Sequence, residues 1–355
     1  MTLRLAQGLI QEGVQVDLVL GEATGPFVKD IPPDVRLVDL GRTRMLSTIY
    51  PLARYLRNER PDAMISALDY ANVAAVIASK ASRTGIPTAV VTHIHVSSDP
   101  SGVSPWKRSI FRLLMRKTYP LAHAVVSVSP GVANDLASVL GLPRARIRVI
   151  YNPVISTDLL IRANESPNHT WLTTQETPVI LAVGRLVEQK DFSTLIRAFA
   201  LVRRQIPARL IILGEGELRA ELRALVSSLN LNDCVDMPGF TENPYGFMHR
   251  AAIVALSSRW EALPTVLIEA LYCGVPVVST DCPSGPAEIL AQGKYGRLVP
   301  VGDPVAMASA LLESLDQKPP VAPPQSWEPY LITNSVREYL SIFECSHRCP
   351  AAAKP

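Results

Sequence analysis

Residues 258–280, SRWEALPTVLIEALYCGVPVVST, contain a loop, a helix and a buried strand in succession. Pro264 and Thr265 provide a helix start, because proline suits the first helical turn, and Gly274 provides its end. The apolar run VPVVST that follows is typical of a strand buried on both faces. This order predicts one unit of a parallel α/β sheet.

Two acids lie on either side of the turn in this stretch. Glu261 lies in the loop, and Glu269 lies about one turn into the helix. Free backbone N–H groups at a helix N-terminus favour an anion such as a diphosphate. Carboxylates beside such a site make sense if they accept hydrogen bonds from sugar hydroxyls. Spacing alone leaves open the alternative that Glu269 is a solvated helix residue and Glu261 a cap.

Short β-branched runs alternate with helical patterns along the whole chain, as in VQVDLVL, PTAVVTH, PVILAVGRL and AAIVALSS. A chain of 355 residues exceeds the usual size of a single core. We therefore predict an α/β protein with two Rossmann-like, doubly wound domains facing across a cleft, with ligands outside the carboxyl ends of the strands. The predicted parts are an N-terminal domain over 1–160, a linker over 161–177, a C-terminal domain over 178–325, a closing helix over 326–345 and a disordered tail over 346–355.

The chain begins inside a helical pattern, TLRLAQGLIQEG, that ends at Gly13. A doubly wound domain ordinarily opens with a strand and a glycine-rich turn before its first helix. The first strand and its phosphate-facing turn are therefore expected to be missing. Either the reading frame starts upstream of Met1, which we favour, or the protein is impaired.

Composition excludes several classes of protein. Lys and Arg total 35 against 32 acids, a net charge of +3, which is too small for a dedicated nucleic-acid binder. The first twenty residues lack the pattern of a signal peptide, and no stretch approaches the ~20 apolar residues of a membrane span.

Five cysteines, an odd number, suit a reducing cytosol. Cys345, His347 and Cys349 make an incomplete zinc set, so no metal is expected.

Other loops that follow predicted strands add polar groups. VGRLVEQKD places Arg185 and Lys190 between a strand and a helix, where two cations can neutralise charge on a departing diphosphate. LGEGEL adds a glycine turn at Gly214, and DCPSGP adds a proline-rich turn at Gly285. Each loop alone is a weak signal.

Together these segments resemble the retaining nucleotide-sugar glycosyltransferases of family four, which have the GT-B fold. The resemblance covers nearly the whole chain and is carried by VGRLVEQKD, LGEGELRAEL, SSRWEALPTVLIEALYCGVPVVSTDCPSGPAEIL and YGRLVPVGD, in the family's order. The spacing of Glu261 and Glu269 matches the family's paired-glutamate motif. Ala262 departs from the glycine that the family usually has, and we expect this to tune specificity.

The resemblance implies roles for these residues. Glu269 would bind the ribose hydroxyls. Glu261, Arg185 and Lys190 would be catalytic residues, with Glu261 contacting the donor sugar and the two cations holding the diphosphate. It also implies a wider set of donor-binding residues, namely Gly184, Gly214, Phe240, Thr241, Leu263, Pro264, Thr265 and Val266. Backbone N–H groups between Leu263 and Val266 would complete the anion site, and the loop with Phe240 and Thr241 would border the nucleobase.

In the N-terminal half, AVVTHIHVSSDP ends a predicted strand with His93 and His95. In similar enzymes a histidine after this strand contacts the donor sugar or the acceptor, and we favour His95 as a catalytic residue. His93 is nearly as good a candidate, and a packed or surface histidine remains an alternative for either. Residues 104–119 place Arg108, Arg112 and Arg116 on one side of a helix. That helix would either dock on an anionic membrane or present an ordinary solvated basic face.

The sequence thus predicts an enzyme, a retaining glycosyltransferase of bacterial polysaccharide, lipopolysaccharide or glycolipid synthesis. Its expected partners are a UDP-, GDP- or ADP-sugar donor and a glycan or lipid-linked acceptor, without a metal cofactor and without nucleic acid. The expected location is the cytoplasm, at the inner face of the cytoplasmic membrane if residues 104–119 dock there. The rival hypothesis is a catalytically impaired nucleotide-sugar binder that lacks the first strand and glycine-rich loop. Epimerases and phosphorylases of the same fold rank last.

Overall fold

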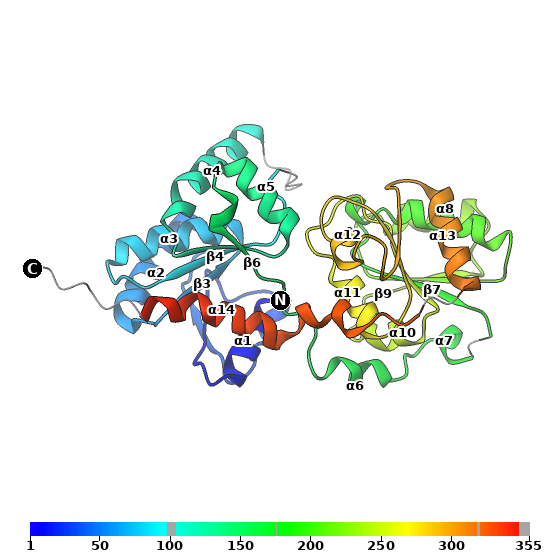
Figure 1. Ribbon diagram of the computed structural model, residues 1–355, viewed down its shortest axis with the longest axis horizontal. Helices are drawn as coiled ribbons and strands as arrows, with labels where there is room; N and C mark the ends of the chain where they lie inside the picture. The colour runs from blue at the N-terminus through cyan, green and yellow to red at the C-terminus, as the bar shows by residue number, and fades with distance from the viewer. Residues whose placement is uncertain (98–103, 175, 318–319, 348–355) are drawn as a thin grey trace, which may run out of the picture. The chain divides into compact units, whose positions relative to one another are not determined.

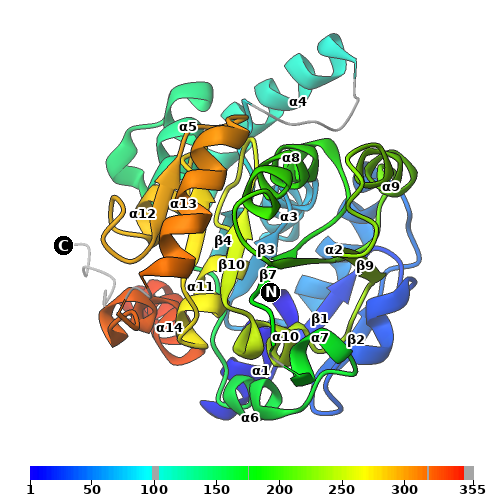
Figure 2. The same ribbon diagram turned by 90° about the vertical axis from the view of Figure 1, so that its right-hand side faces the viewer.

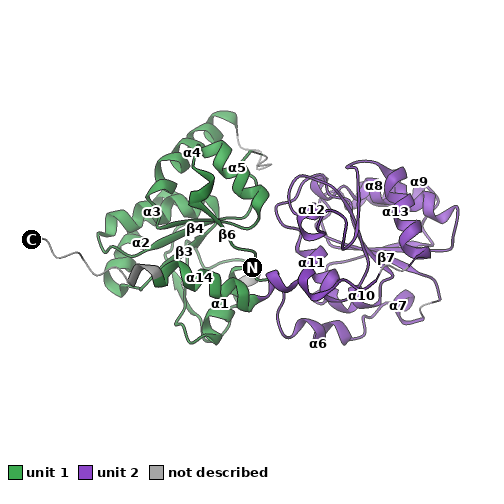
Figure 3. Cartoon of the chain, viewed as in Figure 1, with its two compact units in different colours: residues 1–153, 332–355 green, residues 154–331 purple. Residues whose placement is uncertain are grey.

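The computed structural model describes residues 1–97, 104–174, 176–317 and 320–347. The predicted tail from residue 348 onward, and the side chains of Cys345, His347 and Cys349, lie outside what is described. The chain divides into two compact units (Figure 3). Unit 1 comprises Met1–Pro153 with Ile332–Pro355, and unit 2 comprises Val154–Leu331. Both are α/β with parallel sheets, as the sequence predicts.

Unit 2 contains one parallel sheet of six strands. Its strands are β7 (Val179–Val183), β8 (Arg209–Leu213), β9 (Val235–Gly239), β10 (Ile253–Leu256), β11 (Val277–Thr280) and β12 (Arg297–Val299). Their spatial order is β12-β11-β10-β7-β8-β9. The chain therefore places β8 and β9 on one side of β7, and then β10, β11 and β12 on the other side of β7. This is a doubly wound order, and its switch point lies between β7 and β10.

Helices cover both faces of this sheet (Figures 1 and 2). They are α6 (Leu159–Asn164), α7 (Thr170–Thr174), α8 (Phe192–Arg203), α9 (Arg219–Ser228), α10 (Pro244–Arg250), α11 (Thr265–Tyr272), α12 (Pro286–Ile289) and α13 (Pro304–Asp316). The side chains of Ile180, Leu210 and Ile253 form one buried cluster with those of α8, α9 and α13. Strand residues alternate between the two faces, so a sheet covered on both sides needs continuous apolar strands such as VILAV.

The segment that the sequence analysis assigns to a linker, residues 161–177, includes most of α6 and all of α7. The last carbonyls of α6 accept hydrogen bonds from the Arg250 guanidinium, at 3.3 Å for Ala163 and 3.2 Å for Asn164. The side-chain amide of Asn243 also donates to the Arg162 carbonyl at 2.8 Å. These bonds, with the packing of α6 against α10, attach the segment to unit 2.

The strands of unit 1 are distributed over two parallel sheets. One pairs β1 (Asp17–Leu20) with β2 (Arg36–Asp39), and the other has the order β3-β4-β5-β6. The strands of the second sheet are β3 (Met64–Ala67), β4 (Thr88–Thr92), β5 (Ala124–Ser127) and β6 (Ile147–Val149).

The helices of unit 1 include the last helix of the chain. They are α1 (Thr2–Gln11), α2 (Met45–Glu59), α3 (Asp69–Ser82), α4 (Pro105–Thr118), α5 (Pro130–Leu140) and α14 (Ile332–His347). α14 packs against α1 so closely that a Cβ on Gly8 would lie 2.5 Å from the Ile332 side chain. α14 overlaps residues 326–345, where the sequence analysis expects a closing helix, and it belongs to unit 1.

Candidate active site

The site predicted from the sequence lies in unit 2 at the carboxyl ends of β7 and β10. The β7–α8 loop begins at Gly184 and carries Lys190 in a short 3₁₀ turn, Glu188–Lys190. The β10–α11 loop begins at Ser257 and carries Glu261. Because β7 and β10 are neighbours at the switch point, both loops lie at the sheet edge where doubly wound domains ordinarily bind ligands.

Lys190 and Glu261 form an ion pair between these loops. The Lys190 Nζ lies 2.5 Å from Glu261 Oε1, and the Ser258 hydroxyl donates to the same oxygen at 2.7 Å. Glu261 is 7% exposed, so its charge depends on these two partners. The aliphatic part of Lys190 lies over Gly184, where a Cβ would be 3.3 Å from the lysine Cε. The structure therefore brings these two predicted catalytic side chains into direct contact.

The two loops are held together by backbone and side-chain hydrogen bonds. The Ser257 hydroxyl donates to the Lys190 carbonyl at 2.8 Å, and the Arg259 N–H donates to the Gln189 carbonyl at 2.8 Å. The Gln189 side-chain amide donates in return to the Trp260 carbonyl at 2.9 Å. Lys190 is thus fixed through its own carbonyl as well as through its ammonium group.

Asp191 makes further hydrogen bonds that connect these two loops. It has a φ of 44°, caps α8 by accepting from the Thr194 N–H at 3.3 Å, and receives the Thr194 hydroxyl at 2.9 Å. Its carboxylate also accepts from Arg259 Nε at 3.2 Å. Asp191 therefore ties the start of α8 to the β10–α11 loop, a role that the sequence analysis missed. The spacing of an Asp and a Thr three residues apart before an apolar helix was the signal available.

The glycines of the site permit close contact between backbones. Gly214 follows β8 with a φ of 140°, and a Cβ there would lie 1.9 Å from the Gly184 carbonyl oxygen. Gly285 has a φ of 94°, and a Cβ there would lie 2.3 Å from the Pro264 side chain. Gly214 therefore lets the chain after β8 contact the chain after β7, and Gly285 lets the chain after β11 contact the start of α11.

The α11 helix presents its first turn at this edge of the sheet. Leu263, Pro264 and Val266 are buried, and Thr265 is half-buried at the first helical position. N–H groups in a first turn have no acceptor within their own helix, so they are available to an anion. Glu269 lies one turn further on, and the Tyr245 hydroxyl of α10 donates to its Oε1 at 3.3 Å. Tyr245 was not predicted from the sequence.

Two predicted donor-binding positions are open to solvent. Arg185 is exposed and makes no ion pair within the described part of unit 2. Phe240 is 75% exposed just after β9, and the adjacent Thr241 hydroxyl accepts from the Asn243 N–H at 3.3 Å. An exposed guanidinium and an exposed aromatic ring are available to a ligand without breaking existing contacts.

Cys282 lies close to the ion pair, but it is a poor nucleophile. It is 3% exposed. Burial, and then the negative charge of Glu261, raise the pKa of the Cys282 thiol to about 12. A thiol with so high a pKa stays protonated at neutral pH, so chemistry through a thiolate is disfavoured here.

His93 and His95 belong to unit 1, in the segment after β4. His95 Nδ1 lies 3.9 Å from an oxygen of Asp135 on α5, and the same oxygen accepts from the Val96 N–H at 2.7 Å. The pKa of Asp135 is raised by burial but lowered more by His95 and by hydrogen bonds from Ser97, and lies at about 2. His95 therefore lies near a carboxylate, at a distance longer than a hydrogen bond, whereas His93 lies beside Asn152.

Burial and, to a lesser extent, the positive amino terminus lower the pKa of His93 from 6.5 to about 4, while a hydrogen bond with Asn152 opposes both. The folded protein therefore keeps His93 neutral, while the unfolded chain takes up a proton below about pH 6.5. We expect the free energy of unfolding to fall by about 2 kcal/mol through His93 between pH 7 and 4.5, and no such change above pH 7.

Urea denaturation at both pH values tests this expectation on the wild type and His93→Gln. The variant should lose about 2 kcal/mol less than the wild type on acidification. His249→Gln is the matched control, because His249 is exposed on α10. Equal pH dependence in the wild type and His93→Gln would show that His93 is not held neutral.

No group of three or more His, Cys, Asp or Glu side chains arranged to hold a metal occurs among the residues that the structure describes. Within the same described ranges, no helix combines the length and apolarity that crossing a bilayer requires.

Solved structures share this architecture over nearly the whole chain. A glycosyltransferase from Rickettsia africae aligns with a TM-score of 0.80, covering 98% of this chain and 94% of its own at 15% identity. The Anabaena protein HepE, solved in complex with UDP, aligns with a TM-score of 0.77, covering 97% and 96% at 19% identity. These matches define the class, an α/β protein with parallel sheets in two units and a GT-B-like fold.

Sequence comparison identifies the family. The model described as "Glycosyl transferases group 1" matches residues 169–327, and "Glycosyltransferase Family 4" matches residues 1–157. An uncharacterized glycosyltransferase of Methanocaldococcus jannaschii is 30% identical over 274 residues, which cover 72% of this chain and 67% of that protein. The chain belongs to the group 1, or family four, glycosyltransferases.

A further relative has a stated acceptor chemistry. The lipopolysaccharide 1,6-galactosyltransferase of Escherichia coli is 28% identical, with 75% of this chain and 69% of the relative covered. The resemblance stated from the sequence is therefore confirmed at the level of family and fold.

Proposed function

We propose that the protein transfers a sugar from a nucleoside diphosphate sugar to a hydroxyl group of a glycan or lipid-linked acceptor, with retention of anomeric configuration. The observation that carries this proposal is the Lys190–Glu261 ion pair at the switch point, beside the N-terminus of α11. A cation, a helix N-terminus and two carboxylates at one sheet edge suit a diphosphate that links two hydroxyl-rich rings.

The diphosphate would lie between Arg185, Lys190 and the first turn of α11. Arg185 is exposed and can turn toward the ligand, whereas Lys190 is fixed by its loop. Negative charge grows on the diphosphate as its bond to the sugar breaks, and preorganised positive groups stabilise that charge. These groups would supply the electrostatic stabilisation without a metal cofactor.

The two carboxylates would bind the rings on either side of the diphosphate. Glu269 would accept hydrogen bonds from the ribose hydroxyls, and Glu261 from a hydroxyl of the donor sugar. Phe240 would border the nucleobase, since an exposed ring offers a stacking surface. Uridine is the first base to test, because the Anabaena protein of the same fold was solved in complex with UDP.

The transfer would proceed on one face of the sugar. The bond from the anomeric carbon to the diphosphate oxygen breaks, and the acceptor oxygen forms its bond to the same carbon from the same side. The acceptor proton passes to the departing diphosphate, so atoms and charge balance without a separate base. His95, near Asp135, is proposed to contact the donor sugar or the acceptor.

A panel of UDP-, GDP- and ADP-sugars, scored by the rise in unfolding temperature, would identify the donor. The selected donor, incubated with glycan and polyprenyl-linked acceptors, should give a product whose new linkage has the anomeric configuration of the donor. An inverted product, or free sugar alone with every acceptor, would contradict the proposal. Stabilisation by a donor with no turnover on any acceptor would instead support the rival hypothesis of an impaired binder.

Tyr245 should act through Glu269. Its hydroxyl donates to Glu269 Oε1, so Tyr245→Phe removes one hydrogen bond that orients this carboxylate. We expect KM for the donor to rise about 2- to 10-fold, the equivalent of one ordinary hydrogen bond, with kcat within about twofold. Tyr295→Phe, also in unit 2, is the control and should leave KM unchanged. A fall in kcat with an unaltered KM for the donor would show that Tyr245 does not act by orienting Glu269.

A further inference from the structure

The helix α4 of unit 1 carries apolar side chains that are exposed and do not pack in the core. The inner side of α4 packs through Phe111, whose ring stacks on Tyr70 at 4.3 Å, and through the fully buried Met115. On the opposite side Trp106 is 62% exposed, Ile110 50% and Leu113 54%. Their i, i+4, i+7 spacing places them on one stripe that faces solvent.

The helix that bears this stripe is strongly basic: Lys107, Arg116 and Lys117 are exposed, whereas Arg108 and Arg112 are half-buried with buried Nε atoms. The helix Pro105–Thr118 contains Lys107, Arg108, Arg112, Arg116 and Lys117 and no acidic residue, a charge of +5 on a protein whose total is +3. Lys107 lies over the Trp106 ring at 5.5 Å. The nearby acid on α5, Asp135, accepts from the N–H groups of Val96 and Ser97, and its single negative charge can offset at most one of the five positive charges.

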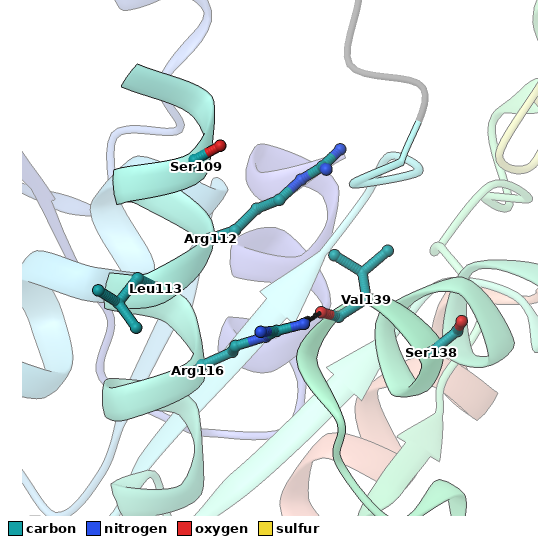
Figure 4. Close-up of a pocket in the computed structure, with 6 residues that line it drawn as sticks. All are labelled: Ser109, Arg112, Leu113, Arg116, Ser138 and Val139. Atoms are coloured by element: carbon teal, nitrogen blue, oxygen red, sulfur yellow. Dashed lines mark hydrogen bonds between the residues drawn. The ribbon is translucent and has the colours of Figure 1, made fainter. Parts of the chain in front are cut away.

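Two of these arginines line a groove between α4 and α5 (Figure 4). The groove has a volume of about 440 Å³ and is lined by Ser109, Arg112, Leu113, Arg116, Ser138 and Val139. Arg116 donates twice to the Val139 carbonyl, at 3.0 and 2.7 Å, and Arg112 donates to the Val96 carbonyl at 2.9 Å. The two guanidinium groups are therefore held in place at the groove, and charge-assisted bonds from their remaining N–H groups would suit a phosphate.

We propose that the α4 surface, defined as the exposed stripe Trp106, Ile110 and Leu113 with the exposed cations Lys107, Arg116 and Lys117, docks on an anionic phospholipid bilayer. The stripe would enter the headgroup region, the cations would face lipid phosphates, and the groove would take one phosphate. Aromatic and aliphatic residues flanked by Lys and Arg are the pattern of helices that lie in a membrane interface. An anionic bilayer supplies negative charge opposite these cations, whereas a folded partner protein would not do so by its nature.

Sedimentation of the full chain with vesicles tests the proposal without any donor, so its outcome is independent of glycosyl transfer. Binding to phosphatidylcholine vesicles containing phosphatidylglycerol should exceed binding to pure phosphatidylcholine at least tenfold, and should weaken as salt is added. Trp106→Ser/Ile110→Ser and Lys107→Gln/Lys117→Gln should each weaken binding at least tenfold. These side chains are exposed, so folding should be preserved.

Matched variants separate this surface from general charge or hydrophobicity. Arg197→Gln/Arg223→Gln and Ile161→Ser remove exposed side chains of unit 2 and should bind vesicles as the wild type does. Ser109→Glu places an acid in the groove and should bind at least fivefold more weakly than Ser109→Gln. Equal binding to both vesicle types, no binding to either, or unchanged binding of the α4 variants would overturn the proposal. So would a self-association of the chain that Trp106→Ser abolishes, because a second copy would then cover the stripe.

Discussion

Replacing Lys190 with alanine should lower kcat by about 10²- to 10³-fold, the usual effect of removing one group that stabilises charge in a transition state. Lys190 is also the partner of buried Glu261, so the variant should lose about 3 kcal/mol of unfolding free energy. Single-turnover rates with saturating donor, measured well below the unfolding temperature, separate the two effects.

A double variant distinguishes catalysis from stability. Lys190→Ala/Glu261→Gln has no unpaired buried charge, and the amide can still accept the Ser258 hydroxyl, so stability should largely return. Turnover should stay low, because the cation is still absent. Lys294→Ala, an exposed lysine of the same unit, should change neither quantity. Recovery of turnover together with stability would mean that Lys190 serves the fold alone.

Gly214→Ala should produce the largest loss of stability, more than about 3 kcal/mol. The new Cβ would lie 1.9 Å from the Gly184 carbonyl oxygen, and the φ of 140° is strained for any side chain. The loop after β7 must move to accommodate it, and that loop carries Arg185 and Lys190. Donor affinity should therefore fall together with the unfolding free energy, which chemical denaturation and ligand titration can measure on the same sample.

Gly302→Ala is the matched control for this variant. Gly302 also has a positive φ, 72°, but a Cβ there would meet nothing within 4 Å. Its cost should be about 1 kcal/mol, from the left-handed backbone alone. A Gly214→Ala protein as stable as Gly302→Ala would show that the close approach of β7 and β8 loops is not needed.

The local parts of the site were predictable from the sequence. Glu261 precedes, and Glu269 lies within, a helix that begins near Pro264 and ends at Gly274. Lys190 lies between a strand and a helix in VGRLVEQKD. These features depend on residues close in sequence, where turn and helix propensities act directly. The parallel sheet was predictable for the same reason, because each strand–helix unit is local.

The contacts that orient the site could not be predicted in this way. The bond from Tyr245 to Glu269 joins residues 24 apart, and the bond from Gln189 to the Trp260 carbonyl joins residues 71 apart. Both depend on the order of strands in the sheet, which local patterns do not specify. The same holds for residues 161–177, which the sequence analysis assigns to a linker, because the end of α6 is capped by the distant Arg250. His93 and His95 look alike in sequence, and the structure distinguishes them by their neighbours, Asn152 for His93 and Asp135 for His95.

The central claim is that unit 2 binds a nucleoside diphosphate at the carboxyl ends of β7 and β10, between Lys190 and the N-terminus of α11. Isothermal titration calorimetry of the full chain with UDP, GDP and ADP tests it most directly. We predict one-to-one binding of at least one of the three, weakened at least tenfold in Lys190→Ala/Glu261→Gln and unchanged in Lys294→Ala. No heat of binding with any of the three, or equal affinity in the double variant, would contradict the account.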